Sequence, residues 1–403
     1  MADRIVITSI GILSALGLGK EAHLQALTTA QAGLQHPQYL KTVHAPEFIM
    51  GEVKMSDDEL ASSLGLPVGN NGYTRTTLLA LIAMRELLQE VDKELLQDGS
   101  FAFINANTVG GMCSVENMYM DFISDKKDGD FIQYIDTLDC AESTENVAKY
   151  FDLKPFMATI STACSSSANA LILGARLIQQ GLVDRAICGG CDAMSRFTVN
   201  GFLSLKNVDK SPCNPFDQNR MGLNLGEGAG YLMLEKESDA KARGVTILAY
   251  FSGYANSNDA YHPTAPSPDG AGAYRTMQQA LIRAGLQRQD IGYINAHGTA
   301  TTNNDASEGK AIERLFSPNV PYFSSTKPFT GHTLAAAGSI EAIFSIWAMQ
   351  EGKIFPNLNF ETQMEELKIS PVSALLEGIE INHVLSNSFG FGGNNVSLLF
   401  SKA

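Results

Sequence analysis

The chain has 403 residues, of which 44% are hydrophobic and 18% charged, and its 29 basic and 43 acidic side chains give a net charge of −14. A chain of this composition buries a large core and is not intrinsically disordered, and its length corresponds to roughly two or three units of domain size. The acidity excludes broad binding to nucleic acid and requires any acidic partner to dock on a local basic patch.

The N-terminal segment Ile5 to Gly19 is mostly apolar, like the apolar part of a signal peptide, but Asp3 precedes it and Thr8 and Ser9 interrupt it. A buried first strand followed by a glycine-rich turn fits better. No uncharged run reaches the ~20 residues that a membrane span requires. Six cysteines are too few for a disulfide scaffold, so we expect a soluble, cytoplasmic protein.

Further along the chain, short apolar runs alternate with longer segments of helical period. We predict strands at Phe101–Ile104, Phe156–Ile160, Arg185–Cys188, Ile247–Tyr254, Ile291–Asn295 and Val396–Phe400. We predict helices at Thr76–Leu96, Ala168–Gln180, Tyr274–Ala284 and Ile340–Met349. This alternation predicts a layered α/β fold with strands buried on both faces. A charged segment, Glu235–Gly244, marks a soft boundary, so we predict two α/β units, 1–244 and 245–403.

The first candidate site is Ser161–Ser167, where the strand Phe156–Ile160 passes into the helix Ala168–Gln180. Cys164 would lie near the positive end of the helix dipole, which lowers the pKa of a thiol and favours a nucleophile. A small buried cysteine beside N-capping serines explains the segment equally well. This segment alone leaves both interpretations open.

Two histidines of the second unit lie at predicted strand-to-helix junctions. His297 comes after Ile291–Asn295, where α/β sheets place ligands, although a lone histidine there is more often structural. His332 precedes an Ala-rich helix, Thr333–Met349, whose N-terminus would keep the imidazole neutral. A neutral imidazole can donate an N–H to a developing oxyanion. One cysteine and two histidines at strand-to-helix junctions therefore predict a thioester site.

The last candidate segment, Asn387–Asn395, alternates glycine with phenylalanine, which suits a bendable loop that gates a hydrophobic tunnel. It lacks the lysine pattern of a phosphate loop, so we do not expect nucleotide binding. Cys188 and Cys191 have CxxC spacing but no second pair at ligand spacing. We interpret them as a strand end that turns through a glycine pair, and we predict no metal site.

In this order, the four segments closely resemble the β-ketoacyl-acyl-carrier-protein synthases of the thiolase superfamily, over nearly the whole chain. Supporting stretches are Asn214–Asp217, Gly226–Gly228, Ser257–His262 and Ser324–Lys327. The resemblance implies a five-layered αβαβα fold of two similar halves, the first carrying the cysteine and the second the two histidines. It also implies a decarboxylative condensation of an acyl thioester with malonyl carried on the phosphopantetheine of an acyl carrier protein. No metal or redox cofactor is required.

The resemblance also implies a role for each matched residue. Cys164 matches the acyl-accepting nucleophile, and His297 and His332 match the pair that supports decarboxylation and condensation. Lys327 matches the lysine beside that pair. Backbone N–H groups of Cys164 and Phe391 would form the oxyanion hole, and Phe391 matches the gating phenylalanine. The other matched positions are Thr299 and Thr301 for the pantetheine arm, Phe202, Phe389 and Met112 for substrate binding, and Asp305, Glu308 and Glu341 as supporting acids.

Several partners and pathways stay open. Three serines follow Cys164 and Asn169 stands where fatty-acid members often carry a histidine, so fatty-acid elongation and a dedicated polyketide or polyene pathway both remain. We expect a homodimer, or a heterodimer with a related ketosynthase-like subunit. Candidates for docking an acidic carrier protein are Lys126, Lys127, Lys206 and Lys210, with Arg75 as a weaker one.

Two other functions of related proteins fit the sequence less well. A chain-length partner subunit would shape the tunnel of an active synthase, but family members of that kind lack the nucleophile. A thiolase would use a second cysteine near the carboxyl end, and this chain has none after Cys213. The active condensing enzyme is therefore the leading hypothesis.

Overall fold

Eleven strands form one continuous sheet in the computed structural model, which describes residues 3–97, 99–124 and 134–403. Ten of them follow the order β4-β3-β5-β6-β1-β7-β13-β12-β8-β9, and β2 pairs with β1. The strands of the first half are β1 (Ile5–Ser14), β2 (Gly17–Leu18), β3 (Phe101–Ala106), β4 (Phe156–Ile160), β5 (Arg185–Asp192) and β6 (Gly228–Lys236). Those of the second half are β7 (Ala249–Asn258), β8 (Tyr293–Asn295), β9 (Tyr322–Ser324), β12 (His383–Gly390) and β13 (Asn394–Ser401). A separate pair joins β10 (Lys353–Ile354) to β11 (Leu376–Glu377).

The two halves of the sheet repeat one arrangement. From β4 to β1 the successive pairs are parallel, parallel, antiparallel and antiparallel, and the same series runs from β9 to β7. The corresponding strands also occur in the same chain order. The halves join where β1 meets β7, through the pairs Val6–Tyr250 and Ile7–Ala249. The expected two similar halves are therefore present, and the predicted division after residue 244 falls between helix α9 and β7.

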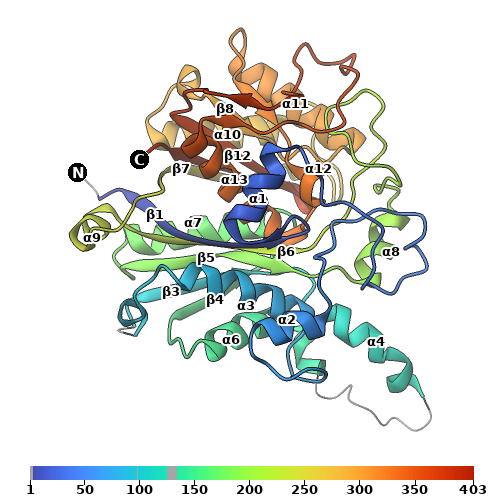
Figure 1. Cartoon of the computed structure of the whole chain (residues 1–403). Helices are drawn as coiled ribbons and strands as arrows, with labels where there is room; N and C mark the ends of the chain where they lie inside the picture. Colours follow the sequence, from blue (N-terminus) through green and yellow to red (C-terminus); the bar gives the residue numbers. More distant parts are fainter. Residues whose placement is uncertain (1–2, 98, 125–133) are drawn as a thin grey trace.

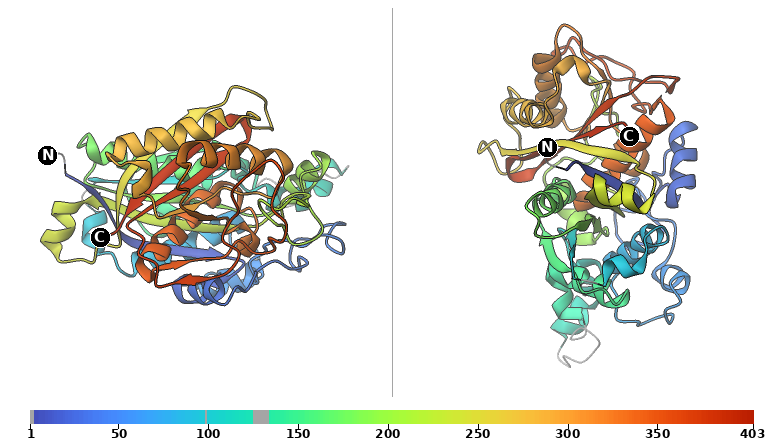
Figure 2. Two further views of the ribbon diagram at one scale, coloured as in Figure 1. Left: turned by 90° about the horizontal axis from the view of Figure 1, so that it is seen from above. Right: turned by 90° about the vertical axis from the view of Figure 1, so that its left-hand side faces the viewer.

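Helices form three layers around these two halves, giving the expected αβαβα arrangement (Figures 1 and 2). Helices α7 and α13 lie between the halves, α3 and α6 cover the first half, and α10 and α11 cover the second. The helices are α1 (Gly19–Thr28), α2 (Asp57–Ser63), α3 (Arg75–Leu88), α4 (Met112–Ile123), α6 (Cys140–Tyr150), α7 (Ser166–Gln179), α8 (Arg196–Ser204), α9 (Glu237–Arg243), α10 (Ala271–Ala284), α11 (Thr302–Phe316), α12 (Lys327–Thr330) and α13 (Ala337–Glu351). Short 3-10 turns are η1 (Lys93–Leu96), η2 (Ile135–Leu138), η3 (Arg288–Asp290), η4 (Leu334–Ala336) and η5 (Phe391–Gly393). Within the described ranges, none of the helices has the length and apolar character needed to cross a bilayer.

The burial of each element follows from its composition. Helix α13 reads Ala-Gly-Ser-Ile-Glu-Ala-Ile-Phe and is buried almost throughout, because it packs against β12 on one side and β6 on the other. Helix α10 packs only one face on β7 and β13, and it is correspondingly amphipathic. The central strands β5 and β6 are buried on both faces, as predicted.

Three sequence predictions need correction. The predicted helix 76–96 ends at Leu88, and a separate turn, η1, follows because Asp92 caps it through the Glu94 N–H. The Cys188–Cys191 pair lies inside β5 and not at a turn. A Cβ at Gly189 would lie 1.9 Å from the Gly230 carbonyl oxygen of β6, so the glycine is required by close strand packing. The predicted helix Thr333–Met349 begins only at Ala337, after the tight turn η4.

Candidate active site

Residues from several segments meet in one cavity of about 170 Å³ at the carboxyl ends of the strands. Cys164 follows β4, His297 follows β8, His332 follows β9, and Phe389 belongs to the end of β12. Predicted site residues that line the cavity are Cys164, His297, His332, Phe389, Phe391, Thr299, Thr301, Phe202 and Lys206. The fold thus brings together groups that are up to 227 positions apart in the chain, from Cys164 to Phe391.

The nucleophile candidate lies in a tight turn between β4 and α7. Ala163 precedes it at φ +53°, a left-handed conformation that is uncommon for a residue with a side chain. The turn is held by hydrogen bonds, among them one from the Thr162 N–H to Ser166 Oγ at 2.8 Å. A Cβ at Gly390 would lie 3.0 Å from the Cys164 nitrogen, so the glycine lets the end of β12 approach this turn closely.

The thiol of Cys164 differs from its predicted state. Helix position alone predicts a lowered pKa, but burial raises the pKa of Cys164 to about 11. The charge of Lys327 and the backbone N–H groups of Phe391 and Cys164 act in the opposite direction. The thiol is therefore neutral at pH 7, and the same two N–H groups lie beside its sulfur. Their role as an oxyanion hole stays a prediction.

His297 and His332 form a pair beside the sulfur. Cys164 Sγ and one ring nitrogen of each histidine all lie within 4.8 Å of one another, and the two rings meet edge to face with centroids 5.4 Å apart. Burial lowers the pKa of both imidazoles well below its usual value, and the nearby Lys327 charge adds to the effect. Both rings are therefore neutral. For His332, burial and Lys327 provide this effect, since α13 begins four residues beyond the predicted position.

Hydrogen bonds fix the tautomer of each neutral ring. Lys327 Nζ lies 3.2 Å from His297 Nδ1, and because an ammonium group has only donors, this Nδ1 accepts. The Leu334 N–H donates to His332 Nδ1 at 3.2 Å. In both rings the hydrogen therefore resides on Nε2. His332 Nε2 is buried and has no hydrogen-bond partner among the described residues, so it offers an N–H to whatever enters the cavity.

The predicted acidic residues lie behind this pair. Glu341 forms a buried ion pair with Lys327, and burial raises the pKa of Glu341 to about 7. Glu308 accepts the backbone N–H groups of His297 and Gly298 at 2.9 and 2.8 Å.

Asp305, the third predicted acid, braces the neighbouring loop. It accepts the N–H of Phe216 at 2.7 Å and of Ala300 at 3.2 Å. Asp305 and Glu308 therefore hold the loop that carries His297, and neither is among the residues that line the cavity.

One group of described side chains has the spacing of metal ligands. Cys164, His297 and His332 have a compatible spacing, but both Nε2 atoms carry hydrogen and both Nδ1 atoms accept other bonds, so the rings are donors here and not ligands. Elsewhere, the buried oxygens that lack a hydrogen-bond partner among the described residues include Asn295 Oδ1, Glu341 Oε2 and Ser386 Oγ. The expectation that the reaction needs no metal stays a prediction.

The predicted substrate contacts are placed as follows. The rings of Phe202 and Phe391 stack with centroids 5.5 Å apart in the cavity wall, and the hydroxyls of Thr299 and Thr301 lie 2.8 Å from each other. Met112 begins α4 and is not one of the residues that line this cavity. Its role in substrate binding stays a prediction.

The docking lysines differ in their surroundings. Lys206 is exposed and contributes to the cavity lining, at the end of α8. Lys210 forms an ion pair with Glu47 at 2.5 Å. Lys126 and Lys127 lie outside the described residues. Lys206 is therefore the candidate best placed beside the cavity.

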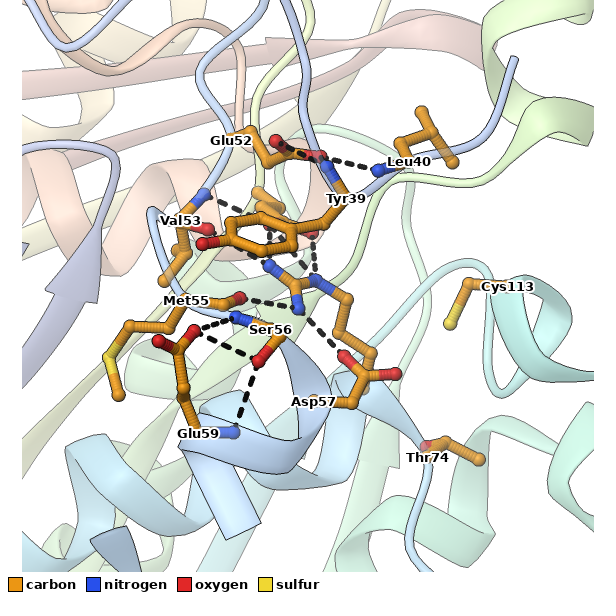
Figure 3. A network of polar contacts seen from close by, with 12 residues as sticks. Tyr39, Leu40, Glu52, Val53, Met55, Ser56, Asp57, Glu59, Thr74 and Cys113 are labelled. Carbon is orange, nitrogen blue, oxygen red and sulfur yellow. Dashed lines mark hydrogen bonds and ion pairs between the residues drawn. The ribbon is translucent and has the colours of Figure 1, made fainter. Parts of the chain in front are cut away.

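The prediction that Arg75 helps to dock the carrier protein is wrong. It is buried, and its guanidinium binds Glu227 at 2.6 Å and Asp57 at 2.7 Å. It borders a second cavity, of about 280 Å³, which Cys113 and Tyr39 also line. Figure 3 shows the polar network there, in which Glu52 accepts the backbone N–H groups of Tyr39 and Leu40. The Arg75 ion pairs join α3 to the start of α2 and to the residue that precedes β6.

The sequence analysis assigned no individual role to several polar residues at the site, among them Asn395 and Asp192. Asn395 lines the main cavity and donates to Asp259 Oδ1 at 2.9 Å. Asp192, at the end of β5, accepts a hydrogen bond from the loop that follows His332. Its position at the carboxyl end of a central strand was a usable signal, but the predicted strand stopped at Cys188 and so placed Asp192 in a turn.

Comparisons with known proteins agree with this geometry. Residues 2–240 match the family model described as "Beta-ketoacyl synthase, N-terminal domain", and residues 248–361 match "Beta-ketoacyl synthase, C-terminal domain". The chain is 32% identical to 3-oxoacyl-[acyl-carrier-protein] synthase 2 of Staphylococcus aureus, over 99% of this chain and 98% of the relative.

Solved structures give the same result. The structure described as the ishigamide ketosynthase/chain length factor superposes with a TM-score of 0.91 and 27% identity over all of both chains. A ketosynthase (ApeO) in complex with its chain length factor (ApeC) from Xenorhabdus doucetiae gives a TM-score of 0.85 and 32% identity, over 100% of this chain and 98% of that one.

Proposed function

The chain belongs to the β-ketoacyl synthase family of carbon–carbon bond-forming acyltransferases, and on this premise we propose that Cys164 is acylated and then condensed with a malonyl thioester held by acyl carrier protein. The observation that carries the proposal is the convergence of Cys164, His297 and His332 within 4.8 Å in one cavity. The acyl chain belongs to fatty-acid or polyketide and polyene biosynthesis. We expect this condensation reaction to need no resident cofactor.

The first step transfers the acyl group to the enzyme. Cys164 loses its proton as the sulfur attacks the thioester carbonyl, the carrier thiol leaves with a proton, and the new bond is a thioester on Cys164. The negative oxygen of the intermediate is held by the N–H groups of Cys164 and Phe391, which already point at the sulfur region. Removing one such donor costs roughly 10²- to 10³-fold in rate.

The second step removes CO₂ from the malonyl thioester. Cleavage of the carbon–carbon bond leaves an enolate, whose oxygen needs hydrogen-bond donors and not bases. His297 and His332 are both neutral and both carry hydrogen on Nε2, so each can donate one hydrogen bond to this oxygen. Lys327 supports the reaction through His297 Nδ1 and does not need to reach the substrate itself.

The third step forms the product. The enolate carbon attacks the Cys164 thioester carbonyl, a carbon–carbon bond forms, and the carbon–sulfur bond breaks. The product leaves as a β-ketoacyl group on the carrier protein, and the Cys164 thiolate takes up a proton. Phe391 stacks on Phe202 beside the sulfur, and a gate at this position would open for the acyl chain and exclude water afterwards.

The partners follow from the surface and the relatives. A relative's name includes acyl carrier protein, and two similar structures contain a chain length factor. Lys206 at the cavity mouth is our candidate contact for the acidic carrier.

All six cysteines are free, which fits the expected reducing cytoplasm.

A dimer contact is proposed on the outer strand β4. This strand is at one end of the sheet and exposes Phe156 at 52% and Met157 at 44%. An edge strand with exposed apolar side chains offers unpaired backbone groups to a second chain. Phe156→Arg should lower the mass measured by sedimentation from that of a pair to that of one chain, and an unchanged mass would exclude this contact.

The division of labour is tested by single-turnover mass spectrometry of the enzyme. Cys164→Ala should abolish the acyl adduct, and a persistent adduct would contradict the nucleophile assignment. His332→Ala should spare acylation but reduce condensation by roughly 10²-fold, because it removes one enolate donor. Equal losses in both steps would contradict the separate roles.

The alternative, a non-catalytic chain-length subunit, has support only from the complexes among the similar structures. The intact cysteine and histidine pair favours the active enzyme. An active subunit that pairs with such a partner stays compatible with every contact described above.

A further inference from the structure

One buried carboxylate outside the family-matched set contacts the loop that fixes His332. Asp192 ends β5 and is fully buried. Its Oδ2 accepts the backbone N–H of Ala335 at 2.9 Å and the Thr108 hydroxyl at 2.5 Å. Its Oδ1 accepts the backbone N–H of Thr108 at 3.1 Å and of Val109 at 3.3 Å. No ion pair of Asp192 occurs among the described residues, so four neutral donors hold this carboxylate.

The turn that Asp192 holds is strained. Leu334, in η4, has φ +52°, which costs a residue with a side chain on the order of 1 kcal/mol or more. A turn of this kind persists only where its surroundings hold it. Asp192 supplies one anchor through the next residue, Ala335, and the second anchor is the insertion of Leu334 into a hydrophobic cluster with Met194 and Leu225.

The strained turn determines the state of His332. In this conformation the Leu334 N–H donates to His332 Nδ1, at 3.2 Å. That bond places the hydrogen on Nε2, where the proposed enolate donor is needed. The main chain of His332 is held separately, by Asn224 O at 2.8 Å and Gly226 N at 3.0 Å. The ring orientation and tautomer therefore depend on the turn, while the backbone position does not.

We propose that Asp192 is a positioning residue, which fixes the ring and tautomer of His332 by holding the Leu334–Ala335 turn. The inference rests on the proposed role of His332 in the condensation. Because Asp192 also binds Thr108 and Val109, it ties the His332 loop to the loop after β3, which leads into α4. Loss of this carboxylate affects the step that uses His332 and leaves the acylation of Cys164 in place.

The test replaces Asp192 and follows the histidine directly. In Asp192→Asn one oxygen becomes an NH₂ group, which cannot accept from the backbone donors that now bind both oxygens. A matched control is Asp217→Asn, because Asp217 is also buried and also uses both oxygens for backbone N–H groups, those of Asn219, Glu361 and Thr362. Nitrogen-15 NMR of histidine-labelled protein reports the tautomer, with His332→Gln assigning the signal.

The wild type and Asp217→Asn should show His332 with hydrogen on Nε2, and Asp192→Asn should show a mixture of tautomers. Condensation by Asp192→Asn should fall on the order of 10²-fold, since small displacements of a catalytic group have effects of this size, while Cys164 acylation stays within about twofold. Should Asp192→Asn fail to fold, Asp192→Ser, which places no NH₂ group against the donors, carries the same prediction.

Two results would overturn the proposal: an unchanged His332 tautomer in the Asp192 variant, or an equal loss of condensation in Asp217→Asn. If the wild type makes no β-ketoacyl product, the proposed function fails, but the NMR signal still decides whether Asp192 fixes the ring.

Discussion

At the scale of single residues, burial determines the chemistry of the site more than helix position does. Cys164 lies just before α7, yet burial raises its thiol pKa to about 11. The same burial keeps His297 and His332 neutral. The enzyme therefore starts from an uncharged thiol and two uncharged donors, a set that stabilises charge only when the substrate develops it.

The neutral state of the Cys164 thiol predicts how its alkylation rate depends on pH. Since the thiolate is the nucleophile, the rate of Cys164 alkylation by iodoacetamide should rise through pH 7 to 10 without reaching a plateau. Mass spectrometry of the modified enzyme measures the rate, and Cys164→Ala corrects for the other cysteines. A plateau below pH 8 would show that the surrounding groups lower the thiol pKa after all.

A second residue-scale prediction separates stability from activity at Lys327. Lys327→Met leaves the buried Glu341 without its cation, and removing one partner of a buried pair costs on the order of 3 kcal/mol of unfolding free energy. The double variant Lys327→Met/Glu341→Gln should recover most of that loss but not condensation, because His297 Nδ1 still lacks its donor. Urea unfolding and turnover provide the two readouts. Recovery of both would mean that Lys327 acts only on Glu341.

At the scale of elements, α1 carries a buried histidine that couples folding to pH. His23 Nε2 lies 2.8 Å from Ser14 Oγ and Nδ1 lies 2.7 Å from the Gly19 carbonyl oxygen, beside Phe344 and Trp347 of α13. Burial lowers the pKa of His23 to about 4. The unfolded chain therefore binds a proton below pH 6.5, while the folded chain does not until about pH 4.

The folded state should accordingly lose about 3 kcal/mol from this group as the pH falls from 7 to 4. Because Glu308 and Glu341 have raised pKa values and act in the opposite direction, the comparison must be made with His23→Gln. Between pH 7 and pH 4, the unfolding free energy of the wild type should fall relative to that of His23→Gln by about 3 kcal/mol. A difference that stays constant with pH would show that His23 is not buried and neutral.

The strands were largely predictable from sequence, because apolar runs such as Phe156–Ile160 form strands with the predicted limits, although β4 lies at the edge of the sheet and is not buried as predicted. The helix boundaries were harder to predict. The helical periodicity of Thr76–Leu96 continues past Leu88, where α3 ends, and it gives no sign that Asp92 caps a separate turn. At the site, the cysteine and both histidines were assigned through the ordered motifs that resemble the synthase family, since their positions alone left a structural role open. Their tautomers, the raised thiol pKa and the Asp192 contact were not predictable, because each depends on atoms from distant segments. Leu334 at φ +52° gives no sequence signal of its own.

At the scale of the whole molecule, an enzyme with a net charge of −14 must attract an acidic carrier through few residues. Lys206 is exposed at the cavity, whereas Lys210 already pairs with Glu47. Lys206→Glu should raise the KM for the acyl carrier substrate on the order of tenfold at low salt, with little change in kcat, because it alters encounter and not chemistry. Lys210→Glu is the matched control, with a smaller effect. An equal rise in KM for both variants would contradict the proposal that Lys206 contacts the carrier protein.

The central claim is that this fold brings Cys164 and two histidine donors together to form a carbon–carbon bond. The most direct test is the intact mass of carrier protein after the enzyme is mixed with acyl- and malonyl-carrier protein, across a panel of chain lengths and unsaturations, with Cys164→Ala alongside. The wild type should add a mass that matches a β-ketoacyl product for at least one acyl chain, and the variant should add none. A product formed equally by Cys164→Ala, or no acylation of the wild type by any donor, would contradict the account.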